Sequence, residues 1–244
     1  MIKKIKLFII STIIAAMLYF LYSYIPYRIE FYGHYDKIWA HRNNSIKKAN
    51  ITEKYFKGIE LDLYYQENGN FLDVNHPPAK SIHLSFSDFL AALKRQPFLW
   101  LDIKNLNSSN SQVILLSLQK ALQKHHYPIY KILIETRFPK VLPPFTKLGF
   151  RSSYYLPYLF NIDSVNRKKE LLSIQKNLKQ QNDIGISFNY NDYELIHKLY
   201  PNRIKYTWII DGLRHRNFNT SKKILNDTTV KVVLIRIKTL KGHR

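Results

Sequence analysis

The sequence predicts an α/β fold, a (β/α)8 barrel of the TIM type preceded by one transmembrane helix. Short runs rich in β-branched and aromatic residues alternate with helical stretches, which is typical of parallel βαβ units. About eight such steps fit into the roughly 210 residues after the N-terminal segment, as a compact barrel requires. An uncharged, apolar run near the N-terminus, residues 7–25, predicts the transmembrane helix. The 244 residues therefore divide into an anchor, residues 1–26, and a barrel, residues 27–244.

The N-terminal run predicts an uncleaved membrane anchor. Residues 7–25 carry no charge and extend about 28 Å as a helix, close to the thickness of the hydrocarbon layer. A secretory signal ends in small residues, whereas this run ends in bulky ones such as Tyr22 and Tyr24. Three lysines lie among the first six residues. The positive-inside rule then places the tail in the cytoplasm and residues 27–244 on the extracytoplasmic or periplasmic side.

The strands of the barrel are predicted from β-rich runs and the helices from apolar residues spaced three and four apart. The strand ranges are Lys37–His41, Gly58–Tyr65, Phe71–Asn75, Phe98–Ile103, Lys131–Glu135, Phe150–Tyr155, Ile184–Asn189, Lys205–Ile210 and Val230–Ile237. The clearest helices are Ser85–Arg95, Ser111–His125, Ser164–Gln181 and Asp192–Leu199. The predicted N-caps are Ser85 or Ser87, Ser109 or Asn110, and Asn191. An open doubly wound sheet is the alternative, but the chain has only 7 glycines and no glycine-rich phosphate loop.

Composition narrows the classes of function. Apolar residues make up 45% of the chain, which excludes a wholly disordered protein, and the absence of cysteine excludes disulfides, thiolate metal sites and cysteine nucleophiles. Lys and Arg number 38 against 17 Asp and Glu, a net charge of +21. Such a surface attracts phosphates, nucleic acid or acidic lipids. Because no nucleic-acid motif accompanies the charge and the anchor argues against one, we expect no nucleic-acid partner.

Three carboxylates predict a site for a divalent cation at the carboxyl ends of the strands, where barrels build their active sites. Glu60 and Asp62 alternate along one strand and so share a face, and Asp102 lies two predicted strands further along the chain. Any one of them alone is better explained by a salt bridge or a helix cap. Carboxylates held together need a cation or a proton between them, and hard oxygen ligands suit Mg²⁺ or Ca²⁺.

Two histidines and two cations accompany these acids in the sequence. His41 and His76 each follow directly on a predicted strand, and a pair of imidazoles can divide general acid and general base work. Arg42 and Lys104 add positive charge, which indicates an anionic ligand such as a phosphate. Glu135, at the end of another predicted strand, is either a further ligand or a structural partner.

Residues 39–104 resemble a known group of enzymes. The sequence reads Ala40-His41-Arg42-Asn43-Asn44-Ser45, then Ile59-Glu60-Leu61-Asp62-Leu63, His76-Pro77-Pro78 and Leu101-Asp102-Ile103-Lys104. The order of these motifs resembles that of the glycerophosphodiester phosphodiesterases within the phospholipase C-like phosphodiesterase barrels. The residues within the motifs are most similar to those of the menorin-like branch of that superfamily. The resemblance implies a barrel fold and a phosphoric diester hydrolase. Outside this stretch, only the strand rhythm and Tyr206-Thr207-Trp208 agree with the group.

The resemblance also implies roles for individual residues. The implied metal ligands are Glu60, Asp62 and Asp102. The implied acid and base are His41 and His76, and the implied phosphate-binding residues are Arg42 and Lys104. Two positions depart from the phosphodiesterase pattern: Asn43 replaces a glycine, and Pro77 replaces an acid after the second histidine. Both departures fit the menorin-like branch.

The sequence therefore predicts a metal-dependent phosphodiesterase that acts on glycerophosphodiesters or lipid head groups. The alternative is a membrane-anchored binding module that keeps the barrel and an anion pocket without turnover. A glycosidase is a third interpretation, but the carboxylates of a glycosidase usually come from different strands on both sides of the scissile bond. Glu60 and Asp62 lie only two residues apart on one strand.

Overall fold

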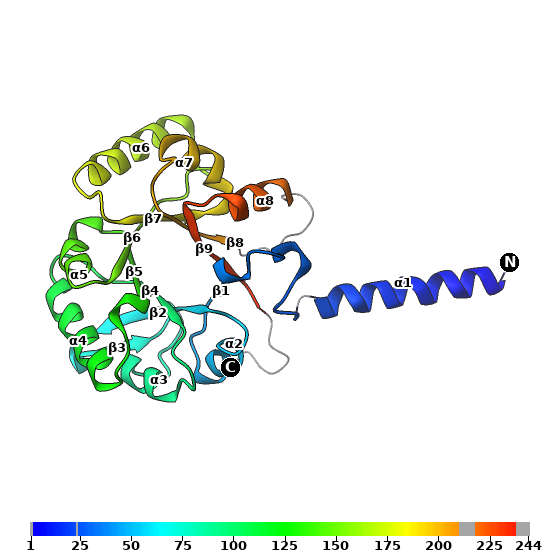
Figure 1. Ribbon diagram of the computed structural model, residues 1–244, viewed down its shortest axis with the longest axis horizontal. Coiled ribbons are helices and arrows are strands. Elements are labelled where there is room, and N and C mark those ends of the chain that lie inside the picture. The colour runs from blue at the N-terminus through cyan, green and yellow to red at the C-terminus, as the bar shows by residue number, and fades with distance from the viewer. Residues whose placement is uncertain (1, 23, 210–217, 238–244) are drawn as a thin grey trace.

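The computed structural model describes residues 2–22, 24–209 and 218–237, and it confirms the predicted barrel (Figure 1). The parallel strands close in the order β1-β9-β8-β7-β6-β5-β4-β2, with β2 paired back to β1. Their bounds are β1 Ile38–Ala40, β2 Gly58–Gln66, β4 Phe98–Ile103, β5 Ile132–Thr136, β6 Arg151–Tyr155, β7 Gly185–Asn189, β8 Lys205–Ile209 and β9 Val230–Ile235. These bounds differ from the predicted ones by no more than two residues at either end, and Ile210 of the predicted strand Lys205–Ile210 lies outside the described residues.

One strand differs from the predicted parallel pattern. β3, Phe71–Val74, runs antiparallel to β2 and lies outside the closed ring. A short connection of Glu67–Gly69 and Asn70, whose backbone is left-handed at φ 49°, joins the two strands. So tight a reversal makes a hairpin, whereas a parallel partner needs a crossover of a dozen or more residues.

Helices cover the outside of the barrel, as Figure 1 shows. Their bounds are α2 Ile46–Thr52, α3 Phe86–Ala92, α4 Ser111–Lys124, α5 Pro143–Lys147, α6 Ser164–Lys179, α7 Tyr193–Leu199 and α8 Phe218–Asn226. The four predicted helices are confirmed; α2, α5 and α8 are short and were not predicted. Ser85 caps α3 by accepting a hydrogen bond from the Asp88 N–H, and Asn110 precedes α4. The prediction of Asn191 as a cap is wrong, because α7 begins after Asp192.

Large side chains fill the interior of the barrel beneath its carboxyl ends. The buried interior cluster consists of Trp39, Trp100, Leu133, Tyr206, Trp208, Val232 and Leu234. A Cβ at Gly58 would lie 2.2 Å from the Trp39 ring, so only glycine lets the indole pack against β2. The interior of the barrel is therefore a packed core and not an open channel, and the polar side chains at the strand ends lie above this core.

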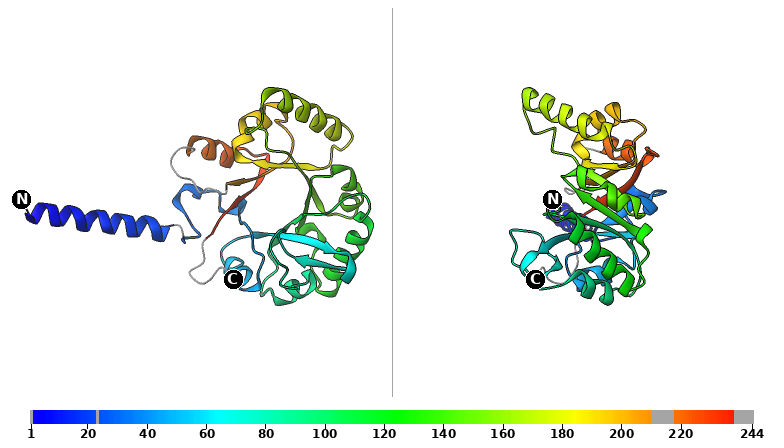
Figure 2. Two further views of the ribbon diagram at one scale, coloured as in Figure 1. Left: turned by 180° about the vertical axis from the view of Figure 1, so that it is seen from behind. Right: turned by 90° about the vertical axis from the view of Figure 1, so that its left-hand side faces the viewer.

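The N-terminal helix α1, Ile2–Tyr22, extends away from the barrel (Figures 1 and 2). Its segment Lys4–Tyr22 has a mean hydropathy of 2.1, and none of its most apolar stretch is buried. The helix is long and apolar enough to cross a membrane, and an N-terminal signal sequence has the same character.

Candidate active site

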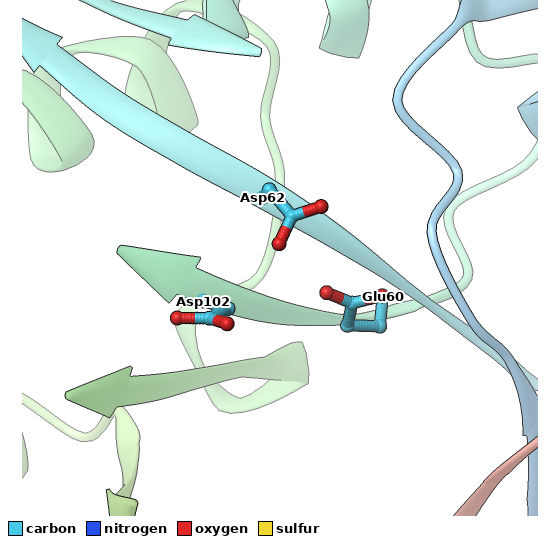
Figure 3. Close-up of side chains that lie close together, drawn as sticks. All are labelled: Glu60, Asp62 and Asp102. Atoms are coloured by element: carbon cyan, nitrogen blue, oxygen red, sulfur yellow. The ribbon is translucent and has the colours of Figure 1, made fainter. Parts of the chain in front are cut away.

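The three predicted metal ligands lie together at the carboxyl ends of β2 and β4. Parallel pairing sets Asp62 opposite Asp102 and Glu60 opposite Trp100. The acids therefore project from neighbouring strands into one space, as Figure 3 shows. One carboxylate oxygen of each lies within 4.8 Å of the others. Glu60 and Asp62 are 2% and 1% exposed, so this cluster belongs to the interior of the cavity.

The chemistry of these donors fits a hard divalent cation. Burial, and then the Asp62 carboxylate, raise the pKa of Glu60 well above its usual range. Burial also raises the pKa of Asp102, although Lys104 opposes the change. Both pKa shifts arise because ionised carboxylates that are close together and away from water are unfavourable. A cation between them would lower this cost in free energy. Three oxygen donors so close together match the ligand type of Mg²⁺ and Ca²⁺.

Lys104 supplies positive charge inside the same cluster. Its Nζ lies 2.6 Å from Asp62 Oδ1 and also donates to Asp102 Oδ2. Burial alone would lower the pKa of this ammonium, but the two carboxylates outweigh burial and raise it. Lys104 is therefore charged and neutralises one of the three acids. Lys104 is predicted to bind the phosphate, but its ammonium group already contacts Asp62 and Asp102.

His41 and Arg42 follow β1 and turn toward Glu60. The Arg42 backbone is left-handed, with φ 55°, and its N–H donates to Glu60 Oε2 at 2.5 Å. A non-glycine residue held in this region stores strain, which is common beside functional sites. His41 Nε2 lies 3.6 Å from the same Glu60 oxygen. Burial, and next the charge of Arg42, lower the pKa of His41 to about 3, so this imidazole is neutral at physiological pH.

The antiparallel strand β3 brings His76 to the same mouth of the barrel. The Asn75 N–H donates to the Asp62 carbonyl at 3.1 Å, which fixes the segment beside the acids. His76 Nε2 lies 3.3 Å from Arg42 Nη2. The two imidazoles thus approach the cluster from different strands, His41 from β1 and His76 from β3. All seven predicted site residues line one cavity of about 440 Å³.

Asn44 holds Asp62 in place, a role that the sequence did not indicate. Its Nδ2 donates to Asp62 Oδ2 at 2.6 Å, and its Oδ1 accepts from the Asp62 N–H at 2.9 Å. Next to it, the Asn43 N–H donates to the Glu60 carbonyl at 2.7 Å. Adjacent asparagines therefore tie the loop after β1 to β2. The sequence marked these asparagines only as part of the stretch Ala40–Ser45 that carries the family resemblance, without indicating what they bind.

Glu135 and an aromatic wall complete the cavity. Glu135 pairs in register with Asp102 and is 3% exposed, and its Oε1 has no hydrogen-bond partner among the residues that the structure describes. Burial, and then the Asp102 charge, raise the pKa of Glu135 to about 8. The cavity also has an aromatic wall, which consists of Phe138, Tyr155, Tyr158 and Trp208. The wall lies beside Arg137, and neither Arg137 nor Phe138 was marked by the sequence pattern.

Buried carboxylates, two imidazoles and an arginine thus meet at the carboxyl end of a closed parallel barrel. Solved structures of known enzymes share this fold. The chain is similar to a glycerophosphodiester phosphodiesterase from Thermotoga maritima, with a TM-score of 0.55, 12% identity, and coverage of 84% of this chain and 96% of that one. It is also similar to a glycerophosphodiester phosphodiesterase from Parabacteroides distasonis, with a TM-score of 0.54, 16% identity, and coverage of 82% and 92%.

A third similar structure is a phosphodiesterase from Oleispira antarctica in complex with its product sn-glycerol-3-phosphate. Its TM-score is 0.52 at 10% identity, with coverage of 82% of this chain and 92% of that one. No protein-family model matches the chain, and no curated protein sequence matches it significantly. The chain thus shares the barrel fold of the glycerophosphodiester phosphodiesterases over most of its length, and similarity at this level of identity is a similarity of fold.

Proposed function

We propose that this chain is a metal-dependent phosphodiesterase that cleaves glycerophosphodiesters or lipid head-group phosphodiesters. The observation that carries the proposal is the cluster of Glu60, Asp62 and Asp102 in one cavity with two imidazoles and Arg42. The similarity of the fold to glycerophosphodiester phosphodiesterases supports it. The resemblance of residues 39–104 to the menorin-like branch remains part of the proposal.

The proposed reaction divides proton transfer between the two histidines. Glu60, Asp62 and Asp102 would hold a divalent cation, which would neutralise charge on the phosphate oxygens. One of the two imidazoles accepts a proton from the nucleophile, which is water or a neighbouring hydroxyl of the substrate. As the new P–O bond forms and the bond to the leaving alkoxide breaks, the other imidazole gives that oxygen a proton. The products are a phosphomonoester, or a cyclic phosphodiester, and an alcohol.

Arg42 is placed to hold the phosphate between these histidines. Its side chain is exposed at the mouth and lies 3.3 Å from His76 Nε2. A guanidinium offers paired donors that match two phosphate oxygens. Its backbone N–H is already committed to Glu60, so the same residue orders a metal ligand and faces the substrate.

We further propose that α1 anchors the barrel in a membrane with the barrel on the extracytoplasmic side. The support is the length and hydropathy of Lys4–Tyr22 and the lysines that precede it in the sequence. A tethered barrel with a strongly basic chain would encounter the head groups of acidic lipids and their deacylated diesters.

One observation favours a second candidate, a binding module without turnover. Lys104 already pairs with Asp62 and Asp102, so part of the acid cluster is neutralised by the chain itself. A module of this kind would bind phosphodiesters equally well after chelation of divalent cations. Metal dependence therefore separates the two candidates.

The test is turnover by the full chain in detergent micelles. Glycerophosphodiesters are supplied with Mg²⁺ or Ca²⁺, and the assay is repeated with a chelator. We expect turnover that requires the cation, and a loss of about 100-fold or more in Glu60→Gln and in His76→Ala. Glu67→Gln, an exposed acid outside the cavity, is the matched control. Absence of turnover in the unmodified chain, or wild-type turnover in both site variants, would refute the proposal.

A further inference from the structure

The aromatic wall of the cavity has no role in the proposed chemistry. Tyr155 meets Trp208 edge to face, with ring centroids 5.0 Å apart, and Tyr158 contacts both rings at 6.5 and 6.3 Å. Trp208 is buried, but Tyr158 and Phe138 are 40% and 53% exposed. The wall thus presents ring surface to whatever enters the cavity beside the acid cluster. Arg42 and the wall line the same cavity.

Arg137 changes what the wall can bind. It follows β5, one strand further round the barrel than Asp102, and its guanidinium carbon lies 4.6 Å from the centroid of Tyr155. The side chain is exposed and lines the cavity. Among the residues that the structure describes, no carboxylate lies within 4.0 Å of it. Glu135 precedes it by two residues but is buried beside Asp102.

Without Arg137, clustered Tyr and Trp rings would suit a quaternary ammonium group, because ring faces attract cations. The guanidinium already covers one of these faces. A second cation in the cavity would meet Arg137 at close range and lose the Tyr155 face. An anionic group would instead gain a charge-assisted hydrogen bond from a guanidinium that the rings hold in place.

We propose that Arg137 is a specificity-determining residue that selects phosphodiesters whose second substituent carries its own anionic group, and that it disfavours choline-like substituents. This inference rests on the proposed phosphodiesterase function. It names the substrate class of the same cavity: a diester that bears a further phosphate or carboxylate. Phosphate-binding Arg42 and selective Arg137 would then hold the two anionic ends of one ligand.

The test compares substrates that differ by one charged group. Glycerophosphoinositol 4-phosphate, glycerophosphoinositol and glycerophosphocholine are supplied to the full chain in detergent with Mg²⁺ or Ca²⁺. We expect kcat/KM to be about tenfold or more higher for the phosphorylated substrate than for glycerophosphoinositol, and lowest for the choline diester. In Arg137→Gln the ratio between the two inositol diesters should fall below about three, mainly through KM. Arg137→Lys should restore part of the ratio.

Lys140→Gln is the matched control, because it removes one exposed positive charge three residues away, outside the cavity lining. An unchanged ratio in Arg137→Gln, or a wild-type preference for glycerophosphocholine, would overturn the inference. Binding of inositol 1,4-bisphosphate and inositol 1-phosphate, measured by calorimetry, separates the two proposals. If no diester is turned over but the bisphosphate binds more tightly and Arg137→Gln abolishes the difference, the enzymatic function fails and the selectivity stands. If the diesters are cleaved but Arg137→Gln changes neither preference, the selectivity fails alone.

Discussion

We predict that Glu135 makes the stability of the metal-free barrel fall with rising pH. Its folded-state pKa is raised from the ordinary 4.5 to about 8 by burial and then by Asp102. Between these values the folded state keeps a proton that the unfolded state has lost. The free energy of unfolding therefore falls by about 1.4 kcal/mol per pH unit. The contribution of Glu135 to stability is therefore full below pH 4.5, and we expect about 3 kcal/mol of it to be lost at pH 7.

The variant Glu135→Gln carries a neutral amide of nearly the same shape and cannot ionise. We expect it to exceed the wild type in stability at pH 7 by about 3 kcal/mol, which corresponds to about 6–12 °C in Tm for a chain of this size. The difference should shrink toward zero as the pH approaches 4.5. All three tryptophans of the chain lie in the barrel interior, so intrinsic fluorescence follows its unfolding.

The assay is thermal unfolding of the full chain in detergent, from pH 5 to 8.5, with a chelator present. The chelator is needed because a bound cation would favour the ionised carboxylates. The exposed acid variant Glu67→Gln is the control, and its Tm should follow the wild-type curve. If the Glu135→Gln curve runs parallel to the wild type over this range, Glu135 does not hold a proton in the folded state and the reasoning is refuted.

Two further predictions concern the acid cluster. Asn44→Ala removes the two hydrogen bonds between Asn44 and Asp62, so we expect Ca²⁺ or Mg²⁺ affinity, measured by calorimetry, to fall 10- to 100-fold; unchanged affinity would contradict this. Lys104→Met removes the ammonium paired with Asp62 and Asp102, so we expect the cation to bind on the order of tenfold more tightly while turnover decreases. Weaker metal binding in Lys104→Met would contradict that prediction.

Local sequence patterns were sufficient to predict the barrel fold and most of the acidic residues that line its cavity. The alternation of Glu60 and Asp62 follows from the period of a strand, and both side chains line the cavity as expected. Trp208, which the pattern places near a late strand of the barrel, lines it as well. Asp102 required only that β4 lie next to β2, which parallel topology makes probable for strands separated by one hairpin and one helix.

Features that depend on contacts between distant parts of the chain could not be predicted from local sequence patterns. The antiparallel direction of β3, which positions His76, depends on its register with β2 and not on its own composition. Tyr155 and Tyr158 have the character of ordinary core aromatics, and only the three-dimensional arrangement turns them toward the cavity. Arg137 is one of many basic residues in a chain with 38 of them, so its place over the Tyr155 ring had no local signal.

The placement of the acids is the strongest physical argument for a cation-dependent function. The chain has only 17 acidic residues, and Glu60, Asp62, Asp102 and Glu135 line one cavity. Packing four carboxyl groups away from water opposes folding unless positive charge or protons compensate. Lys104 compensates for one of them, and protonation of Glu135 removes another. A divalent cation held by the remaining acids would stabilise the negative charge that is left, in the same cavity as Arg42.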